Sequence, residues 1–222
     1  MPNTTHESLA AEAIAYLRES AGAVGGFNGV QQEIIRQANC LYHWAEERGL
    51  ILTDAFWAGS DKFDDTREHH VYLRPDRRII KCTKPGRFGL GHGAGGRYGN
   101  HCDATPLFYL QRLELMNQEF PTDLRFEGMA LGTSEYENDG RLYPYIITSQ
   151  RFIEAADNNK SHPNEEEIED FMRQLGFSLV QETTTSWVRE SDLLVVTDTK
   201  MLNFIISDNG IIPIDLIIGR KP

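Results

Sequence analysis

The sequence is poor in the features that mark secreted, membrane-spanning or metal-stapled proteins. Its 222 residues include three cysteines, Cys40, Cys82 and Cys102, and no CxxC pair. An odd count without that spacing argues against a disulfide framework or a structural zinc site. No stretch approaches the roughly 18 apolar residues of a membrane span, and MPNTTHESLAAEA lacks a basic segment followed by an apolar one. We therefore expect a cytoplasmic protein with no membrane partner.

Positive charge is also scarce. The chain carries 22 Lys and Arg against 33 Asp and Glu, a formal net charge of −11. Broad nucleic-acid binding depends on basic surface that displaces counterions, so we do not expect it. A single anionic nucleotide, held by a few cations and a metal ion, remains compatible with this charge.

Hydrophobic periodicity predicts an α+β protein. Helices are predicted over 7–20, 29–48, 104–120 and 163–177. Strands are predicted over 50–59, 69–75, 77–83, 124–132, 141–149, 178–182, 185–189, 192–197, 203–207 and 211–216. The pattern changes near residue 150, which predicts three parts: a helical extension (1–49), a sheet-rich lobe (50–150) and a smaller lobe (151–222).

The candidate chemistry lies near the C-terminal end. Asp198 follows an apolar strand, Lys200 comes two residues later and Asn203 five residues later. Asp215 follows after a hairpin with Asn-Gly at its turn. A carboxylate and an amide oxygen are suitable ligands for Mg²⁺, and a second carboxylate can orient or deprotonate a hydroxyl. These are the groups that phosphoryl transfer requires.

The chain resembles the protein-kinase superfamily in these residues. Asp198-Thr-Lys200-Met-Leu-Asn203 is similar to the catalytic loop D-x-K-x-x-N, and Asp215 in Ile-Asp-Leu to the metal-binding Asp of D-F-G. Arg78-Ile-Ile-Lys81 is similar to the V-A-I-K of the third strand. More narrowly, the pattern resembles the compact kinase-like domains of phage polyvalent proteins and related bacterial chains.

The resemblance implies a compact two-lobed fold: an antiparallel-sheet N-lobe with an αC-like helix, a reduced C-lobe and an N-terminal helical extension. It implies ATP and Mg²⁺ as cofactors and roles for individual residues. Asp198 would be catalytic with Lys200 nearby, and Asn203 and Asp215 would hold metal. Lys81 would contact the α- and β-phosphates and pair with Glu114. Gly59 and Ser60 precede the lysine strand where the phosphate loop belongs, and Ser149 and Gln150 lie where the hinge would meet adenine.

Three elements of the family pattern are missing. The segment before the lysine strand, AGSDKFDDTREHH, has one glycine, Gly59, and no G-x-G-x-x-G. Val196-Thr197 replaces the His-Arg before the catalytic Asp, so we expect no control by an activation-loop phosphate. Only seven residues follow Asp215, with no A-P-E. Protein phosphorylation is therefore not the expected activity, and the phosphate acceptor is unknown.

Two alternatives remain open. One is a pseudokinase-like module that binds nucleotide or a protein partner without turnover. The other is an unrelated α+β domain in which the motif is a coincidence.

The glycine-rich stretch from Gly86 to Gly99, with seven glycines in fourteen residues, follows the lysine strand instead of preceding it. It is interpreted as an inserted linker that lets the next helix move. The minority hypothesis is that it folds over the nucleotide, so that Arg87 or Arg97 reaches the phosphates.

Overall fold

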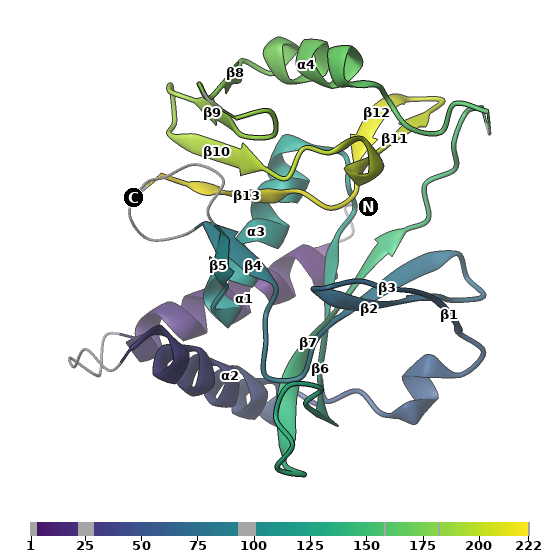
Figure 1. Cartoon of the computed structure of the whole chain (residues 1–222). Helices are drawn as coiled ribbons and strands as arrows, with labels where there is room; N and C mark the ends of the chain where they lie inside the picture. The colour runs from purple at the N-terminus through teal and green to yellow at the C-terminus, as the bar shows by residue number, and fades with distance from the viewer. Residues whose placement is uncertain (1–3, 22–28, 93–100, 158, 182, 222) are drawn as a thin grey trace. The chain divides into compact units, whose positions relative to one another are not determined.

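The computed structural model describes residues 4–21, 29–92, 101–157, 159–181 and 183–221. Its residues cluster into two compact units (Figure 1). Unit 1 comprises Met1–Leu90, Asp103–Glu114 and Asp123–Arg151. Unit 2 comprises Gly91–Cys102, Leu115–Thr122 and Phe152–Pro222.

Unit 1 is built on a five-stranded antiparallel sheet with the order β1-β2-β3-β7-β6. Its strands are β1 (Asp61–Asp65), β2 (His69–Leu73), β3 (Arg78–Thr83), β6 (Arg125–Thr133) and β7 (Leu142–Arg151). The third strand is central, so its side chains have neighbours on both sides. The segment from Ala58 to His70, expected as a loop, therefore contains strand β1 and the turn into β2.

Alternation along β3 separates two faces of this sheet. Ile80 and Cys82 face a small apolar cluster that also contains Ala130 and Ile147. Lys81 faces the other way, together with its cross-strand partners Val71 and Thr148. Sequence alone did not separate the faces, because Ile79, Ile80 and Cys82 show no clean alternation of polarity.

Three helices belong wholly or partly to unit 1: α1 (Thr4–Ala21), α2 (Val30–Glu47) and α3 (Pro106–Glu119), of which residues 106–114 lie in this unit. Leu17 of α1, Trp44 of α2, Leu110 of α3 and Phe126 of β6 are buried in one hydrophobic core. The helices α1 and α2 of the predicted N-terminal extension therefore share a core with α3 and β6. Their apolar faces are buried against the sheet.

The predicted strand over 50–59 is wrong. Ile51 forms an isolated bridge to Met129 of β6, and Asp54–Trp57 forms a 3-10 helix, η1. Gly128, which follows a bulge in β6, makes room for this approach, since a Cβ there would lie 2.2 Å from the Leu50 carbonyl oxygen. The aromatic residues of η1 then cover the outer face of the sheet, beside Ile80. They are β formers by composition, but packing decides their conformation.

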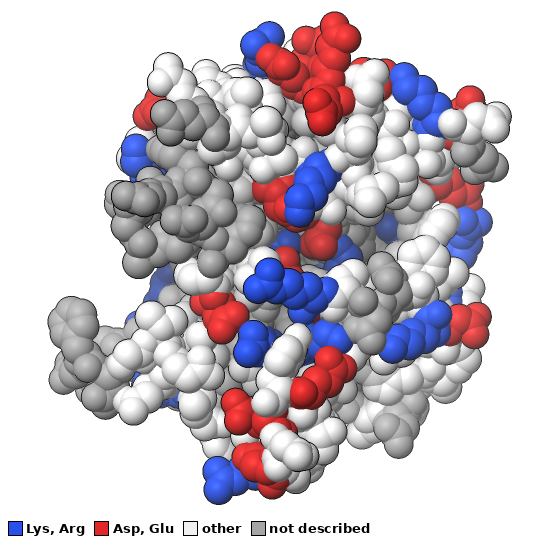
Figure 2. Space-filling view, viewed as in Figure 1, with Lys and Arg blue, Asp and Glu red and all other residues white. Residues whose placement is uncertain are grey.

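Among the residues described between 152 and 221, unit 2 contains helix α4 and two small antiparallel sheets. Helix α4 (Glu165–Gln174) begins with a capping box, in which Asn164 and Glu167 each accept the other's backbone N–H. Acidic side chains gather over α4 at the top of Figure 2. The four-stranded sheet has the order β13-β10-β9-β8, with β8 (Ser178–Leu179), β9 (Trp187–Arg189), β10 (Leu194–Thr197) and β13 (Ile217–Arg220).

The second sheet of unit 2 is the hairpin β11 (Phe204–Ser207) and β12 (Gly210–Pro213), preceded by the 3-10 turn η2 (Met201–Asn203). The strand predicted over 211–216 is wrong at its C-terminal end. Pairing stops at Pro213, the backbone bends at Ile214 and Asp215, and the chain resumes as β13. This break turns Asp215 out of the strand ladder.

The glycine-rich stretch has strands at its two ends, where a linker was expected. These are β4 (Leu90–His92) and β5 (His101–Asp103), which form a two-stranded sheet. Residues 93–100, including Arg97, lie outside the described residues. Within the described part of the chain, no helix is long and apolar enough to cross a membrane.

Candidate functional site

The loop after β10 brings three of the predicted residues together. Asp198 follows buried Thr197 and has a left-handed backbone, with φ +62°. The backbone N–H of Lys200 donates to the Asp198 carbonyl at 2.8 Å, which closes a tight turn. Asp tolerates this conformation better than most residues, because its short polar side chain can hydrogen-bond locally.

The side chains complete the turn. The Asn203 amide nitrogen donates to the Asp198 backbone oxygen at 2.6 Å and to its carboxylate Oδ2 at 2.8 Å. The Lys200 ammonium lies 2.6 Å from the other carboxylate oxygen, Oδ1. Asp198, Lys200 and Asn203 therefore form one hydrogen-bonded cluster. The Lys200 side chain is 66% exposed, so its attraction for Asp198 is screened by solvent.

Strand pairing places the backbone of Asp215 next to the Asp198–Asn203 loop. The Ile214 N–H donates to the Asn203 carbonyl at 2.8 Å, next to the Phe204–Pro213 pair of the hairpin. On the other side, Ile217 pairs with Thr197 of β10. Asp215 thus lies in the short connection between two strands that are paired to both ends of the Asp198–Asn203 loop.

The donor set suits a hard cation that keeps several waters. With its nitrogen donated to Asp198, the Asn203 side chain presents its oxygen, which accepts no hydrogen bond from any described residue. The carboxylates of Asp198 and Asp215 are the acidic groups of the cluster. The described residues hold no group of three or more His, Cys, Asp or Glu side chains that would form a metal cage. An amide oxygen and one or two carboxylates match Mg²⁺.

The predicted phosphate lysine lies on the central strand of unit 1. Its carbonyl accepts the Thr148 hydroxyl at 3.3 Å, and Thr148 also lies 3.5 Å from the Tyr109 hydroxyl of α3. Cross-strand partners share a face, so the Lys81 side chain leaves the sheet on the face where α3 contacts it.

Glu114 is not brought to Lys81. It lies five residues after Tyr109 and so projects about 140° away from it around the helix. The structure gives it no ion pair with Lys81. Partial burial raises the pKa of Glu114 above its usual value, and the Arg18 guanidinium of α1 offsets only part of that effect. Its main charged neighbour is therefore on α1.

Gly59 and Ser60 form the turn from η1 into β1. Gly59 has φ +74°, and the Ser60 N–H donates to the Trp57 carbonyl at 2.9 Å. The Ser60 hydroxyl oxygen is buried and has no hydrogen-bond partner in the part of the chain that the structure describes. Gly59 and Ser60 thus precede β1. The turn between β1 and β2, from Thr66 to Glu68, is the one that occupies the place expected for the glycine-rich loop. There the Thr66 hydroxyl accepts the His69 N–H at 3.0 Å.

The two predicted hinge residues differ in their freedom to meet a ligand. Ser149 is fully buried and pairs with Ile80 on one side and Arg125 on the other. Its hydroxyl accepts from Arg78 at 2.9 Å and donates to Glu127. Among the described strands Gln150 pairs with β3 only, and its buried amide nitrogen has no hydrogen-bond partner among the described residues. Gln150 is thus the first residue of β7 beyond the end of its pairing with β6.

A comparison with protein families supports the resemblance to kinase-like domains. A family model described as Serine/Threonine/Tyrosine Kinase found in polyvalent proteins matches residues 35–220. The chain belongs to this kinase family. The matched range includes all ten of the predicted site residues, and the narrower resemblance to kinase-like domains of polyvalent proteins is confirmed. No curated protein and no solved structure matches the chain.

The sequence of this member of the polyvalent-protein kinase family did not predict two polar contacts of helix α3. Arg112 of α3 donates to the Glu68 carboxylate at 2.9 Å, and these side chains are 7% and 12% exposed. Next to them, the His69 ring lies 3.0 Å from the Tyr109 hydroxyl. The available signal was an arginine on an otherwise apolar helix face, three residues after a tyrosine. Its partner is 44 residues away in the chain.

Proposed function

We propose that this kinase-family chain binds ATP with Mg²⁺ and transfers the γ-phosphoryl group to a hydroxyl acceptor. The observation that carries the proposal is the hydrogen-bonded loop of Asp198, Lys200 and Asn203, with Asp215 beside it in register. Lys81 of unit 1 would contact the phosphates. Asn203 and Asp215 would hold the cation, which would neutralise charge on the phosphate oxygens.

In the proposed reaction, Asp198 positions the acceptor hydroxyl and takes its proton. The acceptor oxygen forms a bond to the γ-phosphorus as the bond from that phosphorus to the bridging oxygen breaks, which releases ADP. Lys200 neutralises part of the negative charge near the transferred group. Asn203 holds Asp198 in its left-handed conformation through two hydrogen bonds, so the carboxylate is oriented before the acceptor arrives.

Two buried polar atoms support a nucleotide base at one end of the unit 1 sheet. No described residue hydrogen-bonds to the Ser60 hydroxyl or to the Gln150 amide nitrogen. Strand pairing relates the two positions. Asp61, which follows Ser60, pairs with Leu73, Leu73 pairs with Ile79, and Ile79 pairs with Gln150. Buried polar groups without partners are rare and call for an explanation. A base that offers hydrogen-bond acceptors and donors would provide one for Gln150.

Calorimetry with ATP and Mg²⁺ tests the proposal. We expect saturable binding by the wild-type chain and its loss in Asp215→Ala, since the cation would lose a carboxylate ligand. Asp198→Ala should still bind ATP, while ADP release in the presence of hydroxyl acceptors should stop. Absence of binding at millimolar ATP would refute the proposal.

The alternative is a pseudokinase-like binder. It is favoured by one observation, the lack of a Glu114–Lys81 ion pair on the helix where the active kinase pattern places it. ATP binding with no ADP release above that of Asp198→Ala, whatever the acceptor, would select this alternative.

A further inference from the structure

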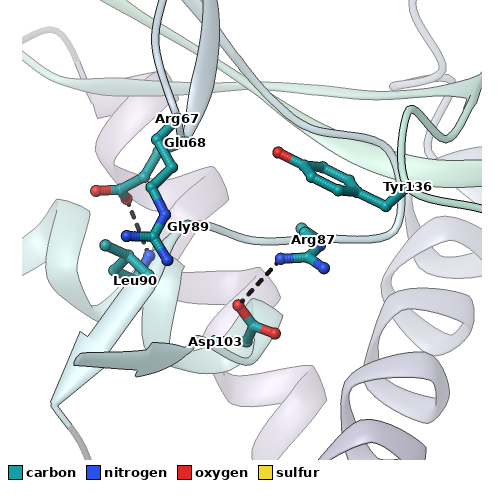
Figure 3. A pocket seen from close by; sticks show the side chains of 7 residues that line it. All are labelled: Arg67, Glu68, Arg87, Gly89, Leu90, Asp103 and Tyr136. Atoms are coloured by element: carbon teal, nitrogen blue, oxygen red, sulfur yellow. Dashed lines mark hydrogen bonds and ion pairs between the residues drawn. The ribbon is translucent and has the colours of Figure 1, made fainter. Parts of the chain in front are cut away.

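A hollow in unit 1 lies where the β1–β2 turn faces the start of the glycine-rich stretch (Figure 3). It is lined by Arg67, Glu68, Arg87, Gly89, Leu90, Asp103 and Tyr136. Arg67 extends from the turn toward Gly89 and Leu90, while Arg87 lies between Tyr136 and Asp103 (Figure 3). The described lining thus comes from four segments that are far apart in the sequence.

The carboxylates of this hollow are already neutralised. Glu68 accepts the Leu90 N–H at 2.9 Å and the Arg112 guanidinium at 2.9 Å from behind. Gly89 allows this arrangement, because a Cβ there would lie 2.5 Å from the Glu68 carboxylate oxygen. Asp103 lies 3.6 Å from Arg87. With Arg112 included, three guanidinium groups face two carboxylates, so one positive charge is in excess.

The excess charge resides on Arg67. Arg67 is exposed and forms no hydrogen bond or ion pair with any described residue. Arg87 is only weakly engaged, since the side chains of its ion pair with Asp103 are 45% and 42% exposed and such pairs contribute about 0–1 kcal/mol. Its guanidinium lies 4.0 Å from the Tyr136 ring centre, which fixes the plane and leaves N–H groups at the edge free to donate.

Strand register places this hollow at the phosphate end of the proposed nucleotide site. His69, next to the turn, pairs with Thr83, and two residues further on Val71 pairs with Lys81. Two residues along a strand span about 7 Å. Ser60 and Gln150 lie at the opposite end of the same strands. A nucleotide lying along β2 with its base at these two residues would direct its phosphates past Lys81 toward Arg67.

We infer that Arg67 and Arg87 bind the phosphate chain of the nucleotide, in place of the backbone of a glycine-rich loop. This inference rests on the proposed function. A guanidinium offers a planar fork of donors that matches phosphate oxygens. A turn without glycine cannot bring its backbone N–H groups close to the phosphates. Two guanidinium groups would supply positive charge and hydrogen-bond donors in their place. Phosphate would displace Asp103 from Arg87.

Calorimetric titration of the full chain tests the assignment with ATP–Mg²⁺, adenosine and inorganic tripolyphosphate as ligands. Arg67→Gln and Arg87→Gln remove the positive charge and keep a polar side chain. Arg74→Gln is the matched control, because Arg74 pairs with Asp76 at 3.1 Å on the β2–β3 turn, at the other end of the strands. Circular dichroism verifies that each variant is folded.

We expect each of the two hollow variants to weaken ATP binding roughly tenfold, to weaken tripolyphosphate binding as well and to leave adenosine binding unchanged. Arg74→Gln should match the wild type. If ATP binding is lost in Asp215→Ala yet unchanged in both hollow variants, the inference is wrong and the proposed function stands. If the wild type binds neither ATP nor tripolyphosphate, both are wrong. Arginine-dependent binding of tripolyphosphate without ATP would overturn the nucleotide assignment.

Discussion

Substitutions of Asp198 should separate the backbone role of this residue from its chemistry. At φ +62°, an ordinary L-residue such as alanine is less stable by about 1–2 kcal/mol. Alanine would also lose the carboxylate's hydrogen bond from Asn203, for which we take about 1–2 kcal/mol because the acceptor is charged but partly exposed. Asp198→Ala should therefore destabilise the chain by about 2–4 kcal/mol.

Glycine and asparagine divide this total. Asp198→Gly removes the steric part and should be about 1 kcal/mol more stable than Asp198→Ala. Asp198→Asn tolerates the left-handed region and keeps an oxygen for the Asn203 amide, so its stability should be within about 1 kcal/mol of the wild type. The amide of the Asp198→Asn variant cannot take the proton from the hydroxyl that receives the phosphoryl group, so ADP release should be lost in this variant as well.

Urea denaturation measures the stabilities, and a coupled ADP assay measures the activity. Equal stabilities for Asp198→Ala and Asp198→Gly would show that the left-handed backbone carries no cost, and the reasoning from φ would be refuted. Retained turnover in Asp198→Asn would refute the assignment of Asp198 as the group that takes the proton.

Three further predictions concern stability. Arg112→Met should cost about 3–5 kcal/mol, since it leaves Glu68 buried and uncompensated, and adding Glu68→Gln should recover much of the loss in urea denaturation. The buried Trp187 indole N–H donates to the Thr199 hydroxyl at 3.0 Å. Thr199→Val leaves this N–H without an acceptor and should lower the free energy of unfolding by about 1–3 kcal/mol, whereas Thr199→Ser should not. The hydrogen-bonded Arg36 guanidinium lowers the pKa of Glu33 from 4.5 to about 2, so its stabilisation is complete above pH 4.5 and is lost as the pH falls toward 2. Because Glu33 is 38% exposed, the loss should be below about 1 kcal/mol, and a pH series of melting temperatures in which Glu33→Gln has the same acid slope as the wild type would contradict it.

The part of the site that could be predicted from sequence is the part that is local. Asp198, Asn203 and Asp215 lie within eighteen residues, and the Asn-Gly hairpin determines how that segment folds back. Lys81 could be placed because its position depends on strand order. Glu114 could not, because an error of one or two residues rotates a helical side chain by about 100–200°.

Other misassignments have equally specific causes. The contact between Glu68 and Arg112 joins segments 44 residues apart, and no local pattern encodes it. The segment 50–59 is rich in β formers, but its aromatic residues are buried on the sheet in a 3-10 helix. The strand β13 was missed because the apolar run from Ile211 to Ile218 hides the break at Asp215.

The candidate cation-binding residues and Lys81 differ in how long a stretch of chain must become ordered to place them. β10 and β13 close a loop of about twenty residues, and every residue that the proposed cation would need lies inside it. Lys81 pairs with Val71 of the preceding strand, but its second partner, Thr148, comes 67 residues later. Since closing a loop costs more entropy as it lengthens and non-local pairing slows folding, the Asp198 segment should become ordered before the central sheet.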